Sequence, residues 1–347
     1  MLAPGFEAVG EAFAADPRGG SALTVLHHGR PVVDLHEGWR DSARTIPWDE
    51  HTLVNVYSVG KPVMAAAVMQ LVQRGQVSLP APTAAYWPSF KTTASVRDLL
   101  SHLAALPSFP VARPVEAWSD WDLLCTDLAE ATAEWEPGTV AAEHALTYGH
   151  LLGELVRRVD GRPPARFVAE EIAAPFDLDL AFALSDEDIA RCAELEFDAP
   201  DWPARMLGAP DSVHARAVSN PPGARDLAVV NSPLWRRAAV PAVNIHATSM
   251  AIARFYAAIL DGRLPDLAVP QHTGTDLFLE SEVTWGLGVQ IEPDGTWGQG
   301  GLGGNAGWAD PTRDLAIAYV TRRLGDFTTV DRIEEALKKA EPKTANF

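Results

Sequence analysis

Strand-forming sequences lie at both ends of the chain and enclose a helix-rich middle. Residues 22–35 alternate as two strands around a His28-Gly29-Arg30 turn, which is typical of a hairpin. Three more alternating stretches follow the middle, at 284–291, 296–299 and 315–321. This order predicts that the two ends of the chain share one antiparallel sheet, while the middle forms a separate helical lobe. The predicted fold class is therefore α/β (α+β), a central antiparallel sheet flanked by helices plus a mostly helical second lobe.

Apolar spacing marks the helices. A periodicity near 3.6 residues predicts helices at 6–15, 95–103, 121–135, 146–159, 166–174, 247–260 and 331–340. Ser95 and Asp98 stand three residues apart at the start of one of them, in the arrangement of a capping box with Asp in place of Glu. These helices fall mainly between the two groups of strands, which supports the division into a sheet and a helical lobe.

The domain boundaries follow from this order. We expect residues 1–61 and 241–347 to form an α/β domain with the antiparallel sheet, and residues 62–240 to form a mostly helical domain. Residues from about 195 to 240 are rich in Pro, Asp and Ala and show little periodicity. A stretch of this length without regular structure is usually functional or disordered. It is therefore interpreted as a long surface loop or lid.

One short stretch has the pattern of a nucleophile site. A strand ending at Tyr57 leads into Ser58, Lys61 and Pro62, followed by an apolar helix. Proline is tolerated in the first helical turn, so Pro62 locates the helix start and places Ser58 at its N-terminal end. Lys61 lies one turn away on the same face, where a desolvated amine can activate a serine hydroxyl. An ordinary N-cap serine and a solvated lysine are the alternative reading of S-x-x-K, which recurs by chance.

Composition excludes several classes of partner. The chain has 347 residues, 28 of them basic and 46 acidic, for a net charge of −18. Phosphate binding needs clustered Lys and Arg, so nucleic acid and anionic membrane surfaces are not expected partners. Cys125 and Cys192 form no metal-type spacing and are expected to be reduced thiols. No secretory signal and no run of about 18 apolar residues is visible, so the chain is predicted to be soluble and cytoplasmic.

Several motifs together resemble the serine beta-lactamase and penicillin-binding-protein superfamily, most closely class C beta-lactamases and the bacterial esterases that share their fold. The matching stretches run in order over nearly the whole chain. They are residues 53–61, 96–102, 137–139, 147–156 and 298–311. The resemblance implies the same fold and an acyl-enzyme mechanism.

The superfamily's three motifs are met unequally. Ser58 and Lys61 match the first motif as nucleophile and partner. The second motif usually supplies a tyrosine, in such esterases followed by His-Ala, and here Glu143 precedes His144 and Ala145. Glu143 therefore stands where the resemblance implies a proton-carrying phenol.

The third motif is Lys-Thr-Gly, or His-x-Gly in the esterases, and here it reads Gln299-Gly300-Gly301. The same alignment implies that the backbone N–H of Leu302 is an oxyanion donor beside that of Ser58. Gln299 keeps hydrogen-bonding capacity but carries neither a proton nor a positive charge. Lysine recognises the substrate carboxylate in lactamases, so beta-lactams are expected to be poor substrates.

The role of Glu143 is open at this point. It is a general base if burial raises its pKa, with Lys61 stabilising charge, or it forms an ion pair that keeps Lys61 charged and opposes its use as a base. If the alignment slips by one residue, Glu143 is a surface residue and Tyr148 is the nearest alternative phenol, although Tyr148 matches a packing position of the family.

The remaining candidates concern the substrate wall. Tyr57 adjoins Ser58 and is interpreted as wall rather than acid, and Trp308 is placed to line an apolar acyl pocket. Gly301 and His144 join the candidate binding residues by their place in the motifs. Histidines such as His102 and His144 are nevertheless more often core or loop residues than catalysts. No metal site is predicted.

The leading functional hypothesis is a serine acyl-enzyme catalyst that hydrolyses or transfers an acyl group from a small-molecule ester, amide or thioester. No cofactor is expected, and the expected partner is the small-molecule acyl substrate. The departures at Glu143 and Gln299 make specialised acyl transfer, as in secondary metabolism, a credible form of this activity. The alternative is a non-hydrolytic protein with a binding role or with Glu143-dependent proton-transfer chemistry in small-molecule metabolism.

Overall fold

The computed structural model describes residues 1–17, 19–206 and 208–340. Its main element is an eight-stranded sheet in the order β2-β1-β12-β11-β10-β9-β8-β7. The pairings given for its strands are antiparallel, and β1 joins β12 from the other end of the chain. The strands are β1 (Gly20–His27), β2 (Arg30–Gly38), β7 (His272–Asp276), β8 (Ser281–Trp285), β9 (Gln290–Ile291), β10 (Trp297–Gly301), β11 (Asn305–Asp310) and β12 (Leu315–Thr321). The predicted sharing of one sheet by both chain ends is confirmed.

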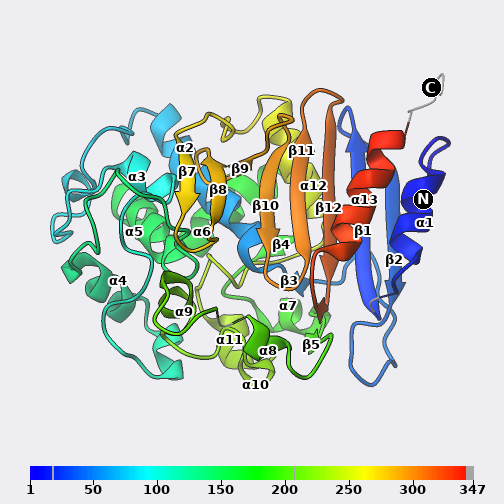
Figure 1. Ribbon diagram of the computed structural model, residues 1–347, viewed down its shortest axis with the longest axis horizontal. Helices are drawn as coiled ribbons and strands as arrows, with labels where there is room; N and C mark the ends of the chain where they lie inside the picture. The colour runs from blue at the N-terminus through cyan, green and yellow to red at the C-terminus, as the bar shows by residue number, and fades with distance from the viewer. Residues whose placement is uncertain (18, 207, 341–347) are drawn as a thin grey trace.

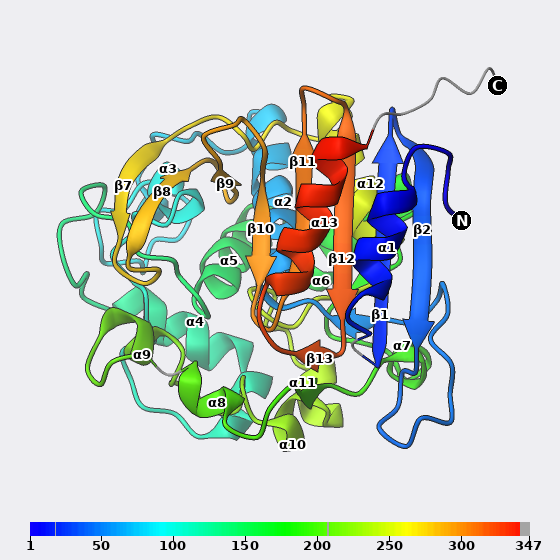
Figure 2. The ribbon, with the colours of Figure 1, turned by 45° about the vertical axis from the view of Figure 1, so that its right-hand side comes forward.

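Helices cover both faces of this sheet (Figures 1 and 2). On one face α1 (Glu7–Ala14) packs beside α13 (Thr328–Lys339). The apolar sides of these two helices pack on the side chains that β1 and β12 present to this face, and together they form one buried core cluster. On the other face α12 (Ser249–Leu260) and α2 (Lys61–Gln73) belong to the large main core. Each helix buries an apolar stripe against the sheet, as the periodicity predicted.

The helical part lies to one side of the sheet, around α5 (Tyr148–Asp160). It also contains α3 (Val96–Leu100), α4 (Trp121–Glu130) and α6 (Pro164–Val168). The predicted Ser95–Asp98 capping box is present. The predicted helix over 121–135 is too long: the carbonyl of Ala129 accepts a hydrogen bond from the Lys91 N–H, and Ala131 adopts an extended backbone.

Residues 195–240 were expected to be a long loop, but their described part contains short elements. These are β5 (Glu196–Phe197), α8 (Trp202–Arg205), α9 (Val213–Ala217), α10 (Leu227–Val230) and α11 (Pro233–Arg237). No helix among them exceeds five residues, so none shows a helical repeat in the sequence. The buried Trp202 and Trp235 anchor this segment. The division into domains at residues 61 and 241 stays a prediction.

The alternating stretch at 284–291 is two strands rather than one. The break follows Trp285, and Gly288 has a φ of 90°. A Cβ at Gly288 would lie 2.4 Å from the Tyr148 hydroxyl, so only glycine fits this close approach. Strand β7 was not predicted, because its sequence His-Thr-Gly-Thr-Asp is polar and half of its pleat faces away from the core.

A small three-stranded sheet holds the segment before Ser58. It consists of β3 (Val54–Asn55), β6 (His246–Ala247) and β4 (Leu180–Ala181), in the order β3-β6-β4. Among the described residues, no helix is long and apolar enough to cross a membrane. Cys125 and Cys192 are free thiols inside the protein, and burial raises the pKa of both.

Candidate active site

Ser58 lies in a single 3₁₀ turn, Tyr57–Gly60, that leads directly into α2. Residues three apart eclipse each other in a 3₁₀ helix, which places the Lys61 side chain over Ser58. The Lys61 Nζ is 2.5 Å from the Ser58 Oγ. Pro62 occupies the first turn of α2, as expected. Tyr57 begins the turn with a φ of 50°, an uncommon conformation for a bulky residue and one that clusters at functional sites.

Lys61 is also paired with Glu143. Its Nζ lies 2.7 Å from the Glu143 Oε1, and the side chains are only 0% and 5% exposed. Burial lowers the pKa of the Lys61 ammonium, and the Glu143 carboxylate opposes this change. Glu143, the residue aligned with the customary tyrosine, therefore faces the nucleophile's partner and is not a surface residue. Ser58, Lys61 and Glu143 form one continuous chain of contacts.

Asp276, at the end of β7, fixes the segment that carries Glu143. Its buried carboxylate accepts hydrogen bonds from the Glu143, Phe278 and Leu279 N–H groups through Oδ1 and from the Trp285 indole through Oδ2. Ala141 bridges to Asp276 as well. This residue was missed, because β7 was not predicted and a lone aspartate in a polar stretch gives no signal in the sequence.

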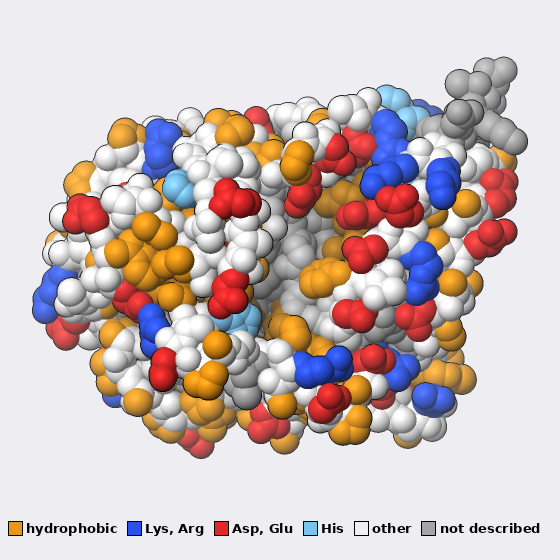
Figure 3. Space-filling view, viewed as in Figure 1, with side chains coloured by type: hydrophobic (Ala, Val, Ile, Leu, Met, Phe, Trp, Pro, Cys, Tyr) orange, Lys and Arg blue, Asp and Glu red, His pale blue; other side chains and the backbone are white. Residues whose placement is uncertain are grey.

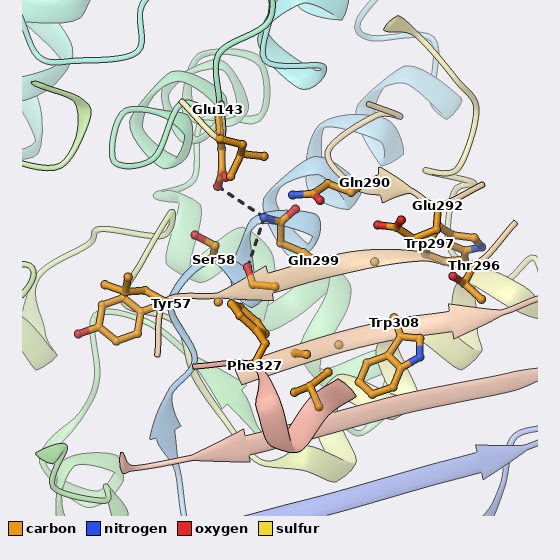
Figure 4. Close-up of a pocket in the computed structure, with 18 of the residues that line it drawn as sticks. Tyr57, Ser58, Glu143, Gln290, Glu292, Thr296, Trp297, Gln299, Trp308 and Phe327 are labelled. Atoms are coloured by element: carbon orange, nitrogen blue, oxygen red, sulfur yellow. Dashed lines mark hydrogen bonds between the residues drawn. The ribbon is translucent and has the colours of Figure 1, made fainter. Parts of the chain in front are cut away.

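Strand β10 brings the third motif to the same place. The Gln299 Nε2 lies 3.5 Å from the Glu143 Oε1 (Figure 4). A Cβ on Gly301 would lie 2.4 Å from the Val56 carbonyl oxygen, so glycine permits the close packing of β10 against the Ser58 segment. Leu302 follows and lines the same pocket as Ser58. Among the described residues, neither the Ser58 N–H nor the Leu302 N–H has a backbone acceptor.

These residues open into a cavity of about 1160 Å³. Figure 3 shows the hollow on this face of the molecule, with acidic side chains along its border. Tyr57, Ser58, Glu143, Gln299 and Trp308 all contribute to the lining, as does Phe327, whose ring was not singled out in the sequence (Figure 4). The Tyr57 hydroxyl donates to the Ala224 carbonyl, and burial raises the pKa of the phenol, so Tyr57 is a neutral part of the wall.

His102, His144 and Tyr148 lie behind the pocket. His144 is fully buried, does not line the cavity, and accepts a hydrogen bond from the Leu106 N–H. Burial lowers its pKa to about 3. The Tyr148 hydroxyl donates to the Leu100 carbonyl, and its ring packs on His102. The expected place of His144 in the substrate wall is therefore not what the structure shows, and Tyr148 is a packing residue.

Residues from the segment 195–240 also line the cavity, and the sequence did not identify which ones. His214, Val218, Ala224 and Arg225 line it. The described residues contain no group of three or more His, Cys, Asp or Glu side chains able to hold a metal ion.

Comparisons with known proteins agree with this geometry. The beta-lactamase family matches residues 7–340. "Esterase/beta-lactamase LipL" of Mycobacterium tuberculosis is 33% identical over 345 residues, covering 88% of this chain and 77% of its own. A penicillin-binding-protein homologue from Caulobacter crescentus superimposes with a TM-score of 0.87 at 31% identity, covering 98% of this chain and 99% of its own.

A family VIII carboxylesterase has the same TM-score, 0.87, at 28% identity, with 98% of each chain covered. The match in sequence spans almost all of the described chain, and each of these two structures covers 98% of this chain. The protein belongs to the beta-lactamase family.

Proposed function

We propose that this protein is a serine acyl hydrolase that cleaves small-molecule esters through an acyl-enzyme on Ser58. The observation that carries the proposal is the contact chain from the Ser58 Oγ through the Lys61 Nζ to the Glu143 Oε1, at the wall of a large cavity. The esterase relatives support the same chemistry.

The contacts suggest the route of the serine proton. Lys61 lies between the other two groups, and its burial favours a neutral amine. Lys61 passes one proton to the Glu143 Oε1 and takes the Ser58 proton as the Oγ–carbon bond forms. When the acyl–oxygen bond breaks, Lys61 protonates the leaving alkoxide and recovers its proton from Glu143. Glu143 is thus the proton store, the role implied for the missing tyrosine.

The two backbone donors that have no backbone acceptor in the described part of the chain have a role in this scheme. The Ser58 and Leu302 N–H groups both belong to residues that line the cavity. Donors that are already oriented stabilise the negative oxygen that forms in the tetrahedral intermediate. The start of the 3₁₀ turn adds the positive end of the peptide dipoles.

The cavity has room for more than one reactant. Its volume of about 1160 Å³ exceeds the ~300–1,000 Å³ that ordinary ligand sites occupy. Transfer of the acyl group to an alcohol or amine is therefore the second candidate, and amides and thioesters are further possible donors. Gln299 in place of lysine disfavours carboxylate-bearing beta-lactams.

Two conclusions from the sequence stay predictions: that the protein is cytoplasmic, and that its partners are small-molecule substrates and not nucleic acid.

The test is hydrolysis of p-nitrophenyl butyrate, with nitrocefin as the lactam comparison. The proposal expects ester turnover that falls to the solution background in Ser58→Ala and falls at least 10²-fold in Lys61→Ala. Full turnover in Ser58→Ala, or no ester turnover by the intact protein, contradicts it. Transfer is scored by adding a primary alcohol and measuring the new ester by chromatography.

A further inference from the structure

Arg225 brings a positive charge without a counter-ion to the cavity. It lies between α9 and α10 and lines the cavity that contains Ser58. Its Nη1 donates a hydrogen bond to the Met206 carbonyl oxygen at 2.8 Å, and it forms no ion pair within the described residues. The other Lys and Arg side chains of the described lining each have a carboxylate partner: Arg313 with Asp310, and Lys338 with Glu335.

The guanidinium of Arg225 keeps one edge free, formed by Nε and Nη2. Neither nitrogen has a hydrogen-bond partner among the described residues, and neither is one of their fully buried unpaired atoms, so both stay accessible to solvent. The bond from Nη1 to Met206 anchors the group, and the same carbonyl oxygen lies 3.2 Å from the His214 Nε2. Two parallel N–H donors on one edge match the two oxygens of a carboxylate.

Arg225 lies on one side of the nucleophile. The carbonyl of the preceding residue, Ala224, accepts a hydrogen bond from the Tyr57 hydroxyl, and Tyr57 is next to Ser58 in the chain. Figure 4 shows Tyr57 on one side of Ser58 and Glu292 on the other. Among the described lining residues, none of the carboxylates lies on the segment that carries Arg225. An anionic group bound to Arg225 is therefore kept apart from the acidic border at Glu292.

Burial makes this unpaired charge costly. It lowers the pKa of the Arg225 guanidinium, with the Tyr57 phenol opposing the change. At Arg157 and Arg191, by contrast, hydrogen bonds to carboxylates raise the pKa of the guanidinium. A partly desolvated charge without a partner raises the free energy of the protein, and a ligand of opposite charge lowers it again. One uncompensated cation matches a single negative charge, which is that of a carboxylate rather than the nearly double charge of a phosphate monoester.

We propose that Arg225 binds a carboxylate of the substrate and so favours esters that carry one carboxylate over neutral esters of the same shape. The inference rests on the proposed function, since it assumes that Ser58 attacks the ester carbonyl. The uncharged Gln299 on β10 offers no ion pair. A carboxylate that faces β10 therefore gains nothing, whereas one that faces the Tyr57 side of the cavity gains a bidentate ion pair.

The test uses two pairs of esters, each with a carboxylate in one member and an isopropyl group of the same shape in the other. Mono-p-nitrophenyl adipate and p-nitrophenyl 6-methylheptanoate place this group on the acyl side. The second pair, 4-acetoxybenzoate and 4-isopropylphenyl acetate, places it on the alcohol side. For each pair the ratio of the kcat/KM values, anionic over neutral, is measured for the intact protein and for Arg225→Met. Comparing the ratios cancels the intrinsic reactivity of the esters and any loss of folded protein.

The ratio is expected to fall about tenfold or more in Arg225→Met for at least one pair, the effect of losing hydrogen bonds between charged groups. The pair that responds identifies the side of the ester that carries the carboxylate. Arg313→Met is the matched control, because it removes the same charge from another place in the lining. Its ratios should match those of the intact protein, and an equal fall in this variant would indicate general electrostatic attraction and refute the direct contact.

The outcomes separate this inference from the proposed function. Unchanged ratios in Arg225→Met for both pairs overturn the inference, as does an intact protein that cleaves the neutral esters but neither anionic one. In both cases the proposed function stands, because the neutral esters are still cleaved. If the intact protein cleaves none of the four esters, the proposed function itself fails.

Discussion

Replacing Glu143 by glutamine separates the two roles open to this residue. Glu143→Gln keeps the size and a hydrogen-bonding group beside the Lys61 Nζ but removes the carboxylate 2.7 Å away. If Glu143 stores the serine proton, acylation loses a general base, which is worth about 10²-fold or more, or about 2.7 kcal/mol of activation free energy. If Lys61 alone is the base, the change has the opposite effect, because losing the carboxylate lowers the pKa of Lys61 further and leaves more neutral amine.

The stability of this variant has a predictable pH dependence. Removing one member of a buried ion pair costs about 3–5 kcal/mol while the other stays charged. The folded-state pKa of Lys61 lies below that of the unfolded chain, so between those values the unfolded chain binds more protons. Without the Glu143 carboxylate the folded-state pKa of Lys61 falls further, so the stability deficit is complete below the variant's folded pKa. The deficit shrinks as pH rises toward the folded pKa of Lys61 in the intact protein, above which both proteins gain stability at the same rate. Urea unfolding of both proteins at pH 7 and pH 9.5 should show the gap narrowing.

The assay is the pre-steady-state acylation rate with p-nitrophenyl acetate, measured by stopped flow. Glu154→Gln is the matched control, because Glu154 is another fully buried, ion-paired glutamate, with Arg157 and Arg158 as partners, and it does not line the cavity. This control should lose stability but acylate at the normal rate per folded molecule. An unchanged or faster acylation in Glu143→Gln would refute the proton-store reasoning and leave Lys61 as the sole base.

Three further outcomes follow from the packing around the site. Asp276→Asn places an N–H donor among the four N–H groups that Asp276 accepts from, so we expect the free energy of unfolding in urea to fall by about 2–3 kcal/mol. Glu143 also loses its anchor, so kcat should fall with little change in KM. An unchanged kcat would assign Asp276 a purely structural role. Tyr148→Phe removes only the hydrogen bond to the Leu100 carbonyl, so it should lower the free energy of unfolding by about 1 kcal/mol without slowing ester turnover. A 10²-fold fall in the turnover rate would instead make Tyr148 the proton carrier. Burial lowers the pKa of His150 to about 3, and among the described residues neither ring nitrogen has a partner, so His150→Phe should stabilise the fold by about 1 kcal/mol at pH 7. As pH falls below about 6.5, His150 takes up a proton in the unfolded chain but not in the folded protein. Between pH 6.5 and pH 4 the free energy of unfolding should therefore fall less steeply in His150→Phe than in the intact protein. Equal slopes of unfolding free energy against pH would show that burial of a neutral His150 is not the cause.

The sequence predicted best what local chemistry determines. The Ser58–Lys61 approach is set within one turn, and Pro62 marks the start of its helix, so spacing placed the two side chains on one face, although it left an N-cap serine and a solvated lysine as an alternative. The hairpin of β1 and β2 and the capping box of α3 are equally local. Their hydrogen bonds join residues close in sequence, which is why pattern and propensity were sufficient there.

The remaining features depend on tertiary contacts. Glu143 reaches Lys61 across 82 residues, and only the resemblance to the family placed it at the site. Asp276 could not be found, because its function is to bind N–H groups of distant segments. The orientation of the Gln299 amide depends on the distant Glu143 beside its nitrogen, and His144 lies one layer behind the position that its motif suggested.

The most direct test of the account is to locate the covalent intermediate. The protein is mixed with an activated ester or a fluorophosphonate, quenched in acid, and analysed as intact mass and as peptides. The account predicts one acyl or phosphonyl group per chain, attached to Ser58 and absent from Ser58→Ala. Turnover of the ester without any adduct, or an adduct on another residue that persists in Ser58→Ala, would contradict it.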